Sequence, residues 1–269
     1  MNRLENNFFE LSALGERALM PFICGGFPRP GDTAKLLQAI ERAGCRFAEV
    51  GIPFSDPIAD GPVIAAAMHQ ALEQGVTPPK VFDEVHSVRE NSRLAIIAMV
   101  SYSIVHKAGG PGPFCNHAKD AGFDGLIVPD LPFEESTELI SQAKSRDLCL
   151  SLLIAPTTPF ERAAEIAKAS TGFIYLMART GITGVSSGAP DVSSKVAALR
   201  EVTKLPIAIG FGIGTADHVR AVTEHADAAI VGSVLVKRMS ESIAQRRDPI
   251  QDAEAMIRDL QKGLFKAPA

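Results

Sequence analysis

The sequence lacks the features that mark several classes of protein. Its four cysteines are far apart and form no C-x-x-C pair, and no apolar run is long enough to span a bilayer. The formal net charge is only -4, with acidic and basic residues interspersed, so neither a nucleic-acid footprint nor a polybasic membrane patch is present. The first residues contain no apolar segment typical of a signal peptide. We therefore expect a cytoplasmic protein with reduced core cysteines that binds neither nucleic acid nor membrane.

What the sequence has is a regular alternation of apolar segments and helical patterns. The predicted strands are 19–24, 47–50, 94–100, 123–128, 148–154, 172–177, 206–209 and 226–231. The predicted helices are 3–17, 32–43, 64–72, 82–88, 114–121, 134–144, 160–169, 192–202, 215–223 and 251–262. Strands that are apolar throughout are buried on both faces, as in parallel sheets. Eight such units predict a TIM (β/α)8 barrel with an extra N-terminal helix, as one domain over 1–269, and a doubly wound open sheet is the alternative.

One stretch, 49–62, combines a strand end with an acidic loop. Glu49 closes an apolar segment, and Asp56 and Asp60 follow on a loop that four prolines make stiff. Carboxyl groups placed in this way suit general acid/base chemistry, although a solvated turn beside an edge glutamate is the structural alternative. In a TIM barrel the active site lies at the carboxyl ends of the strands. That rule selects Glu49, Tyr102, Asp130, Tyr175 and Arg179 as candidates.

Glycines follow the last two predicted strands, at 209–215 and at 228–233, and each segment opens a helix. Glycine lets the backbone approach an anion, and the first N–H groups of a helix have no partner within it. TIM barrels often bind phosphate at these two loops, and the loop 181–184 is a third candidate contributor. Tight turns alone would also explain the glycines. A dinucleotide site is disfavoured because Asp227 lies at the start of its strand, so a phosphomonoester substrate is predicted.

The stretch from Glu49 to Pro62 closely resembles the signature of the tryptophan synthase alpha subunit family. The resemblance continues through 21–23, 124–132, 179–184, 210–213 and 231–233. It implies a lyase of tryptophan biosynthesis that cleaves indole-3-glycerol phosphate to indole and glyceraldehyde 3-phosphate in a retro-aldol reaction, without a metal or an organic cofactor. It also implies a partner, the pyridoxal-phosphate-dependent beta subunit, in an alpha2beta2 heterotetramer.

The resemblance further implies a role for each matching residue. Glu49 would protonate indole C3 and take the glycerol hydroxyl proton, and Asp60 would pair with the indole N–H. The indole pocket would be lined by Phe22, Tyr102, Tyr175 and Phe211. The phosphate would be bound by Gly184, Gly212, Gly232 and Ser233, and Thr183 would lie on a loop that closes over Asp60.

Three positions differ from the usual family pattern. Phe27 replaces the usual Asp of Gly-Asp-Pro, Ile104 replaces the Asn of Tyr-x-Asn, and Ala65 replaces a Gln. Phe27 and Ile104 are expected on the face that meets the beta subunit. A stand-alone indole-3-glycerol-phosphate lyase, a non-catalytic activating partner barrel and another phosphate-binding barrel such as an isomerase are therefore kept as alternatives.

Overall fold

The fold is a closed parallel β-barrel. The computed structural model describes residues 2–58, 60–178, 192–210 and 212–265. Its strands are β1 (Ala18–Cys24), β2 (Phe47–Gly51), β3 (Ala95–Met99), β4 (Gly125–Ile127), β5 (Cys149–Leu150), β6 (Leu153–Ile154), β7 (Ile174–Met177), β8 (Ile207–Gly210) and β9 (Ala228–Val231). Every pair of neighbours is parallel, in the order β5-β4-β3-β2-β1-β9-β8-β7-β6.

The two outer strands of that order, β5 and β6, are halves of one extended segment, so the sheet closes on itself. On one side the Ser151 N–H donates to Leu126 O at 3.0 Å, and on the other the Tyr175 N–H donates to Leu152 O at 3.2 Å. Counting β5 and β6 as one segment gives eight strands within the described chain. The predicted TIM barrel is confirmed, and the open doubly wound sheet is wrong.

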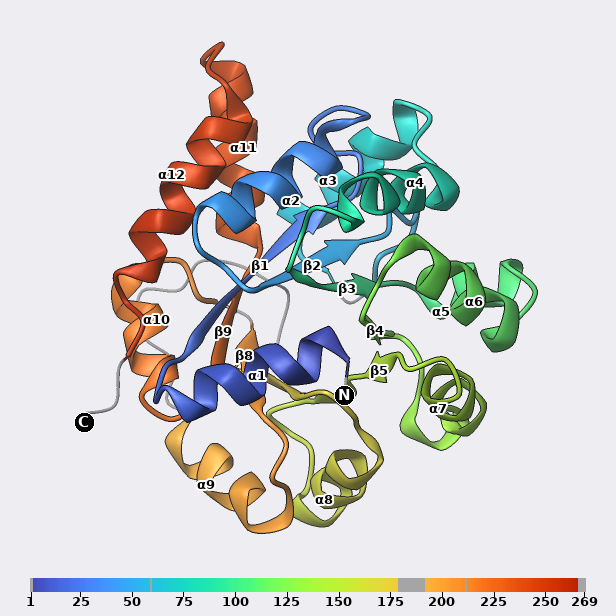
Figure 1. The fold of residues 1–269 in the computed structure, drawn as a ribbon, viewed down its shortest axis with the longest axis vertical. Coiled ribbons are helices and arrows are strands. Elements are labelled where there is room, and N and C mark those ends of the chain that lie inside the picture. The colour runs from blue at the N-terminus through green and yellow to red at the C-terminus, as the bar shows by residue number, and fades with distance from the viewer. Residues whose placement is uncertain (1, 59, 179–191, 211, 266–269) are drawn as a thin grey trace.

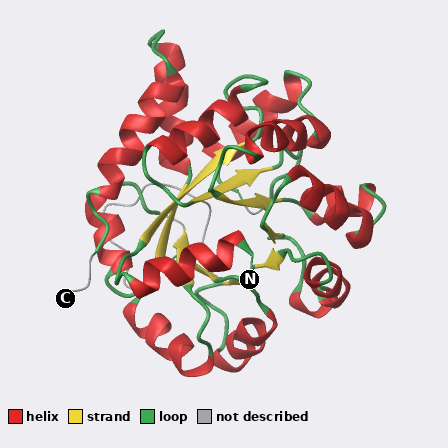
Figure 2. Ribbon diagram, viewed as in Figure 1, coloured by secondary structure: helices red, strands yellow, loops and turns green. Residues whose placement is uncertain are grey.

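Helices surround the barrel (Figures 1 and 2). They are α1 (Arg3–Ala13), α2 (Asp32–Arg42), α3 (Pro62–Glu73), α4 (Pro78–Arg89), α5 (Tyr102–Lys107), α6 (Pro111–Ala121), the 3-10 turn η1 (Phe133–Glu135), α7 (Thr137–Lys144), α8 (Phe160–Ala169), α9 (Ser193–Val202), α10 (Ala216–Thr223), α11 (Ser233–Ala244) and α12 (Pro249–Gln261). Each outer helix buries an apolar stripe against the strands; in α2 it is formed by Leu36, Leu37 and Ile40. None of the described helices is both long enough and apolar enough to cross a membrane.

The extra N-terminal helix α1 lies across one end of the barrel (Figure 1). Its Leu4, Phe8 and Leu11 belong to a cluster with inward-facing strand residues, distinct from the larger core between strands and outer helices. The Phe8 ring centroid lies 4.3 Å from that of Phe47 and 5.9 Å from that of Phe173. Because β1, β2 and β9 all begin near this helix, α1 closes the N-terminal end of the barrel and leaves the other end for a site.

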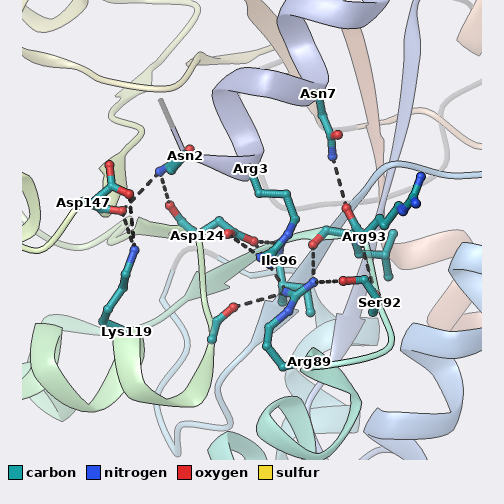
Figure 3. A network of polar contacts seen from close by, with 12 residues as sticks. Asn2, Arg3, Asn7, Arg89, Ser92, Arg93, Ile96, Lys119, Asp124 and Asp147 are labelled. Carbon is teal, nitrogen blue, oxygen red and sulfur yellow. Dashed lines mark hydrogen bonds and ion pairs between the residues drawn. The ribbon is translucent and has the colours of Figure 1, made fainter.

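A buried carboxylate, Asp124, holds helix α1 and the strands together at the same end of the barrel. Asp124, just before β4, accepts from the Ile96 N–H of β3 at 2.9 Å and from Arg3 Nη1 of α1 at 2.8 Å. Arg89 of α4 lies 3.6 Å from its second oxygen, and Asn2 donates to its carbonyl at 3.0 Å (Figure 3). One side chain thus joins α1, β3 and the approach to β4.

The bounds of two helices were not predicted from the sequence. The short α5 starts at Tyr102 with Ser101 as its cap, and six residues are too few for a clear apolar period. The longer α11 follows Gly232, where the sequence indicated that a helix opens but its extent was not predicted; its Leu235, Val236 and Met239 are buried. The predicted helix 134–144 begins instead at Thr137, after the η1 turn. All four cysteines are free and buried, which confirms their predicted place in the core.

Candidate active site at the carboxyl end of the barrel

Glu49 points into the barrel from β2. It lies two residues after Phe47, a member of the inner cluster, and alternate residues of a strand share a face. In the sheet register it lies between Phe22 of β1 and Ile97 of β3. Its exposed fraction is 0%, and neither carboxyl oxygen has a hydrogen-bond partner among the described residues. Burial, and secondarily the charge of Asp60, raises the pKa of Glu49 to about 8, so the carboxyl group is mainly protonated at neutral pH.

Glycines at the carboxyl ends of the strands make room for two aromatic rings beside Glu49. A Cβ at Gly51 would lie 2.5 Å from Phe22 Cζ, and one at Gly232 would lie 3.1 Å from Phe22 Cδ1. On the other side of the barrel, the Tyr175 hydroxyl lies against Gly210 in the same manner. Both rings are buried. The glycines therefore give the mouth of the barrel an aromatic lining.

Asp60 lies at the edge of an open cavity with about 350 Å³ of empty space. It is the last acidic residue of the loop between β2 and α3, and its N–H donates to Pro57 O at 2.9 Å. Burial raises the pKa of Asp60 to about 6, so this carboxyl group is mainly ionised at neutral pH. The cavity lining also includes Met68 of α3 and Met99 of β3. The two carboxyl groups thus differ in charge at one pH, which suits one for proton donation and the other for stabilising a cation.

The predicted phosphate-binding residues Gly212, Gly232 and Ser233 follow strands β8 and β9. β8 and β9 are neighbours in the sheet, so their carboxyl ends lie side by side. Gly212 has a φ of +82°, which favours glycine. Gly232 precedes α11, and Ser233 is the first residue of that helix. The first N–H groups of a helix have no partner within it and can bind an anion.

Comparison with known proteins identifies the family of this chain. A family model described as tryptophan synthase alpha chain matches residues 8–264. The chain belongs to the tryptophan synthase alpha chain family. A relative from Laribacter hongkongensis with that name is 40% identical over 96% of this chain and 98% of its own, and one from Synechococcus sp. (strain CC9902) is 45% identical over 87% and 88%. The crystal structure of the tryptophan synthase alpha subunit from Legionella pneumophila superposes with a TM-score of 0.89 at 31% identity, covering 98% of both chains.

Family membership confirms the prediction of a tryptophan synthase alpha chain, a carbon–carbon lyase of tryptophan biosynthesis. It also implies a beta-subunit partner. The structure shows which predicted site residues of this tryptophan synthase alpha chain come together. Glu49, Phe22 and Gly232 are neighbours, and Tyr175 lies across the barrel against Gly210. The predictions for Thr183, Gly184 and Phe211, and for Arg179, fall outside the described residues.

A fourth carboxylate, Asp130, supports the same cavity. It follows β4 and accepts from Ser101 Oγ at 2.6 Å and from the Tyr102 N–H at 2.8 Å. These bonds fix the first turn of α5, and with it the half-buried Tyr102. The strand-end rule selected Asp130 from the sequence, but its partners could not be found there because they lie 28 and 29 residues away.

Two of the departures from the family pattern now have positions. Phe27 is only 1% exposed and packs in the core, so its expected place on a partner-facing surface is wrong. An apolar ring suits this buried position, whereas a charged side chain would be costly to bury there. Ile104 is half-buried on α5, against the same core. The described residues contain no group of three side chains suited to holding a metal ion.

Proposed function

We propose that this tryptophan synthase alpha chain cleaves indole-3-glycerol phosphate with Glu49 as the acid and base and Asp60 as the carboxylate beside the indole nitrogen. The observation that carries the proposal is Glu49 itself: a fully buried carboxyl group, without a hydrogen-bond partner in the described structure, at the mouth of a parallel barrel. A buried acid with a pKa near 8 holds a proton at neutral pH and can donate it.

The proton balance of the reaction suits one carboxyl group. Glu49 donates its proton to indole C3, which turns the ring into an indolenine cation. Glu49, now a carboxylate, takes the proton from the adjacent glycerol hydroxyl. The carbon–carbon bond breaks as the aldehyde forms, its electron pair returns to the ring, and Glu49 is protonated again. No proton is gained or lost overall.

Asp60 would act on the charge that this reaction creates. When C3 is protonated, positive charge spreads to the ring nitrogen, and an ionised carboxylate beside the N–H stabilises it. The pKa of about 6 keeps Asp60 mainly ionised at neutral pH, while Glu49 keeps its proton. Two acids whose environments separate their pKa values in this way support distinct roles.

The rest of the substrate would be bound by the residues around these acids. Phe22, Tyr102 and Tyr175 supply aromatic surface for the indole ring. Gly212, Gly232 and Ser233 supply backbone at the carboxyl ends of adjacent strands for the phosphate. We extend the proposal to Phe211 in the pocket, Gly184 at the phosphate and Thr183 above Asp60 on the family resemblance alone.

We also propose docking of the beta subunit over this end of the barrel, in an alpha2beta2 heterotetramer. Ile58, on the loop that carries Asp56 and Asp60, is 74% exposed. Phe160, which begins α8 after β6, is exposed as well. Large exposed apolar side chains beside a site indicate a surface that a partner covers. A single-domain organisation over 1–269, supported by the one continuous sheet, and a cytoplasmic location belong to the same proposal.

An assay for indole tests the proposal directly. Purified protein is incubated with indole-3-glycerol phosphate, and indole is measured with and without the matching beta subunit. We expect slow release alone and faster release with the partner. Fast release without a partner, with no complex on sizing, would instead support the stand-alone lyase, and no release under either condition would contradict the catalytic assignment.

The partner surface has its own matched pair of variants. Ile58→Asp should reduce the ratio of activity with the beta subunit to activity without it, because a charge would be buried in the interface. Leu14→Asp is the control: Leu14 is 64% exposed, but it follows α1 at the opposite end of the barrel. Equal activation ratios for the two variants would exclude the loop of Ile58 from the interface.

A further inference from the structure

His218 joins the loop after β8 to the helix that follows it. Its ring nitrogen Nδ1 lies 3.2 Å from the carbonyl oxygen of Gly212 and 3.4 Å from the backbone nitrogen of Gly214. Its own N–H donates to Thr215 Oγ1 at 3.2 Å, which caps α10. In many helices a Glu or Gln at this third position reaches back to the cap. Here a histidine occupies it and reaches further, to the glycines of the loop.

A single Nδ1 can serve only one of these two partners at a time. When Nδ1 carries a proton it donates to the Gly212 carbonyl, and when it does not it accepts from the Gly214 N–H. The contact with Gly214, at 3.4 Å, is longer than the contact with Gly212, at 3.2 Å, and the ring reaches both partners from one position. The ring is therefore placed between two alternative bonds to one loop.

This loop belongs to the proposed phosphate site. Gly212 is one of its predicted residues, and its φ of +82° sets the direction of the chain that follows. The Gly214 N–H is a backbone donor at the start of a helix, where anions bind. It can donate to a phosphate oxygen only after it stops donating to His218.

We propose that His218 is a positioning residue for the substrate phosphate and exchanges one loop contact for the other when phosphate binds. In the empty site Nδ1 accepts from the Gly214 N–H. When a phosphate oxygen takes that N–H, the neutral ring changes tautomer: Nε2 loses its proton to water, Nδ1 gains one from water, and Nδ1 donates to the Gly212 carbonyl. The loop keeps one bond to α10 in either state. This inference rests on the proposed phosphate site.

Kinetics of three variants test the positioning role. Replacing His218 by Ala removes both contacts, so KM for indole-3-glycerol phosphate should rise about fivefold to tenfold, the effect of roughly one hydrogen bond, with kcat little changed. His218→Gln should restore KM, because an amide both accepts and donates. His225→Ala is the matched control, since His225 is exposed and lies beyond α10. An unchanged KM in His218→Ala would overturn the proposal.

A second measurement follows the ring itself. With ¹⁵N-labelled histidine, Nδ1 of His218 should change from the unprotonated to the protonated type of signal as inorganic phosphate is added to the wild-type protein. Phosphate binding that leaves this signal unchanged would overturn the exchange of contacts. Failure of the wild-type protein to bind phosphate or release indole would instead overturn the proposed function, so the two failures are distinguishable.

Discussion

Two buried carboxyl groups, Glu49 and Asp124, lie toward opposite ends of the same barrel and are treated in opposite ways. Asp124 has a backbone N–H, the guanidinium of Arg3 and, slightly further away, Arg89 (Figure 3). Glu49 has no hydrogen-bond partner among the described residues. Burial raises both pKa values, but at Asp124 the Ile96 N–H, Arg3 and Arg89 oppose that rise. The same type of group therefore serves as a structural link at one end and as a proton carrier at the other.

The difference reflects the distinct requirements of a catalytic carboxyl group and a structural one. A buried carboxyl group without partners destabilises the folded chain, so its presence calls for a functional explanation. At Glu49 the missing partners keep the proton available for transfer. At the closed end, where α1 packs over the inner cluster, Asp124 is instead surrounded by hydrogen-bond donors. Four predictions separate these two roles.

The largest effect is expected at Glu49. Glu49→Gln keeps the shape of the side chain but cannot give up or take the catalytic proton, so kcat should fall by about 10²- to 10⁴-fold. Below pH 4.5, where the carboxyl group is protonated in the folded and the unfolded chain alike, stability should change little, and at higher pH the variant should be the more stable of the two. Indole release and urea unfolding measure the two quantities. Cleavage near the wild-type rate would remove Glu49 from the mechanism.

The next effect is on stability, at Asp124. Asp124→Ala leaves the Ile96 N–H without an acceptor and Arg3 without its carboxylate, so the free energy of unfolding should fall by about 2–4 kcal/mol. The activity of the folded fraction should persist, because the site lies at the other end of the barrel. Urea unfolding gives the first quantity and indole release per folded molecule gives the second.

A similar contact elsewhere provides the comparison for Asp124. Asp227, just before β9, accepts from the Ile207 N–H of β8 at 2.7 Å and pairs with Arg200. Its side chain is less buried than that of Asp124, so Asp227→Ala should cost less. An equal or larger loss at Asp227 would show that the links to α1 and Arg89 add nothing.

The sequence predicted the barrel better than it predicted these links. Continuous apolar segments located every strand within a few residues, because strands buried on both faces carry that signal in each position. For helix α11 only the start at Gly232 and Ser233 was predicted, as part of an anion site, and its extent was not. The short α5 had too few residues for a period.

The residues of the candidate site could likewise be predicted only where a local sequence pattern indicates them. Glu49 was selected because a carboxyl group at the end of an apolar strand is unusual. Asp56 and Asp60 share the stiff loop that follows, and only the family resemblance singled out Asp60. Asp124 and Arg3 could not be paired from the sequence, since 121 residues separate them and no local pattern records the contact. The contacts of His218 could not be predicted either, because its partners are backbone atoms of a loop whose shape depends on Gly212.

The pH dependence of stability gives a third, smaller effect. The pKa of Glu49 is about 8 in the folded chain and 4.5 ordinarily. Between these values the unfolded chain has lost a proton that the folded chain keeps, so stability falls as pH rises through that window. The burial of Asp60 adds a similar decline up to its pKa of about 6. Urea unfolding of wild-type and Glu49→Gln proteins across the window should show a steeper decline in the wild type; parallel curves would contradict the raised pKa.

The smallest effect is expected at Arg3, which shares the closed end with Asp124. Its side chain is 37% exposed, so solvent already weakens the ion pair, and Arg3→Met should cost only about 0.5–1 kcal/mol. Arg46→Met is the control, because the Arg46–Glu10 pair also holds α1 but its carboxylate is 60% exposed, against 7% for Asp124, and it should cost less still. In a double-mutant cycle, Arg3→Met should add nothing to Asp124→Ala, since Arg3 has then already lost its carboxylate. Full additivity would mean that Arg3 holds α1 through contacts other than Asp124. Asp124 would then stabilise the fold mainly through its hydrogen bond from the Ile96 N–H.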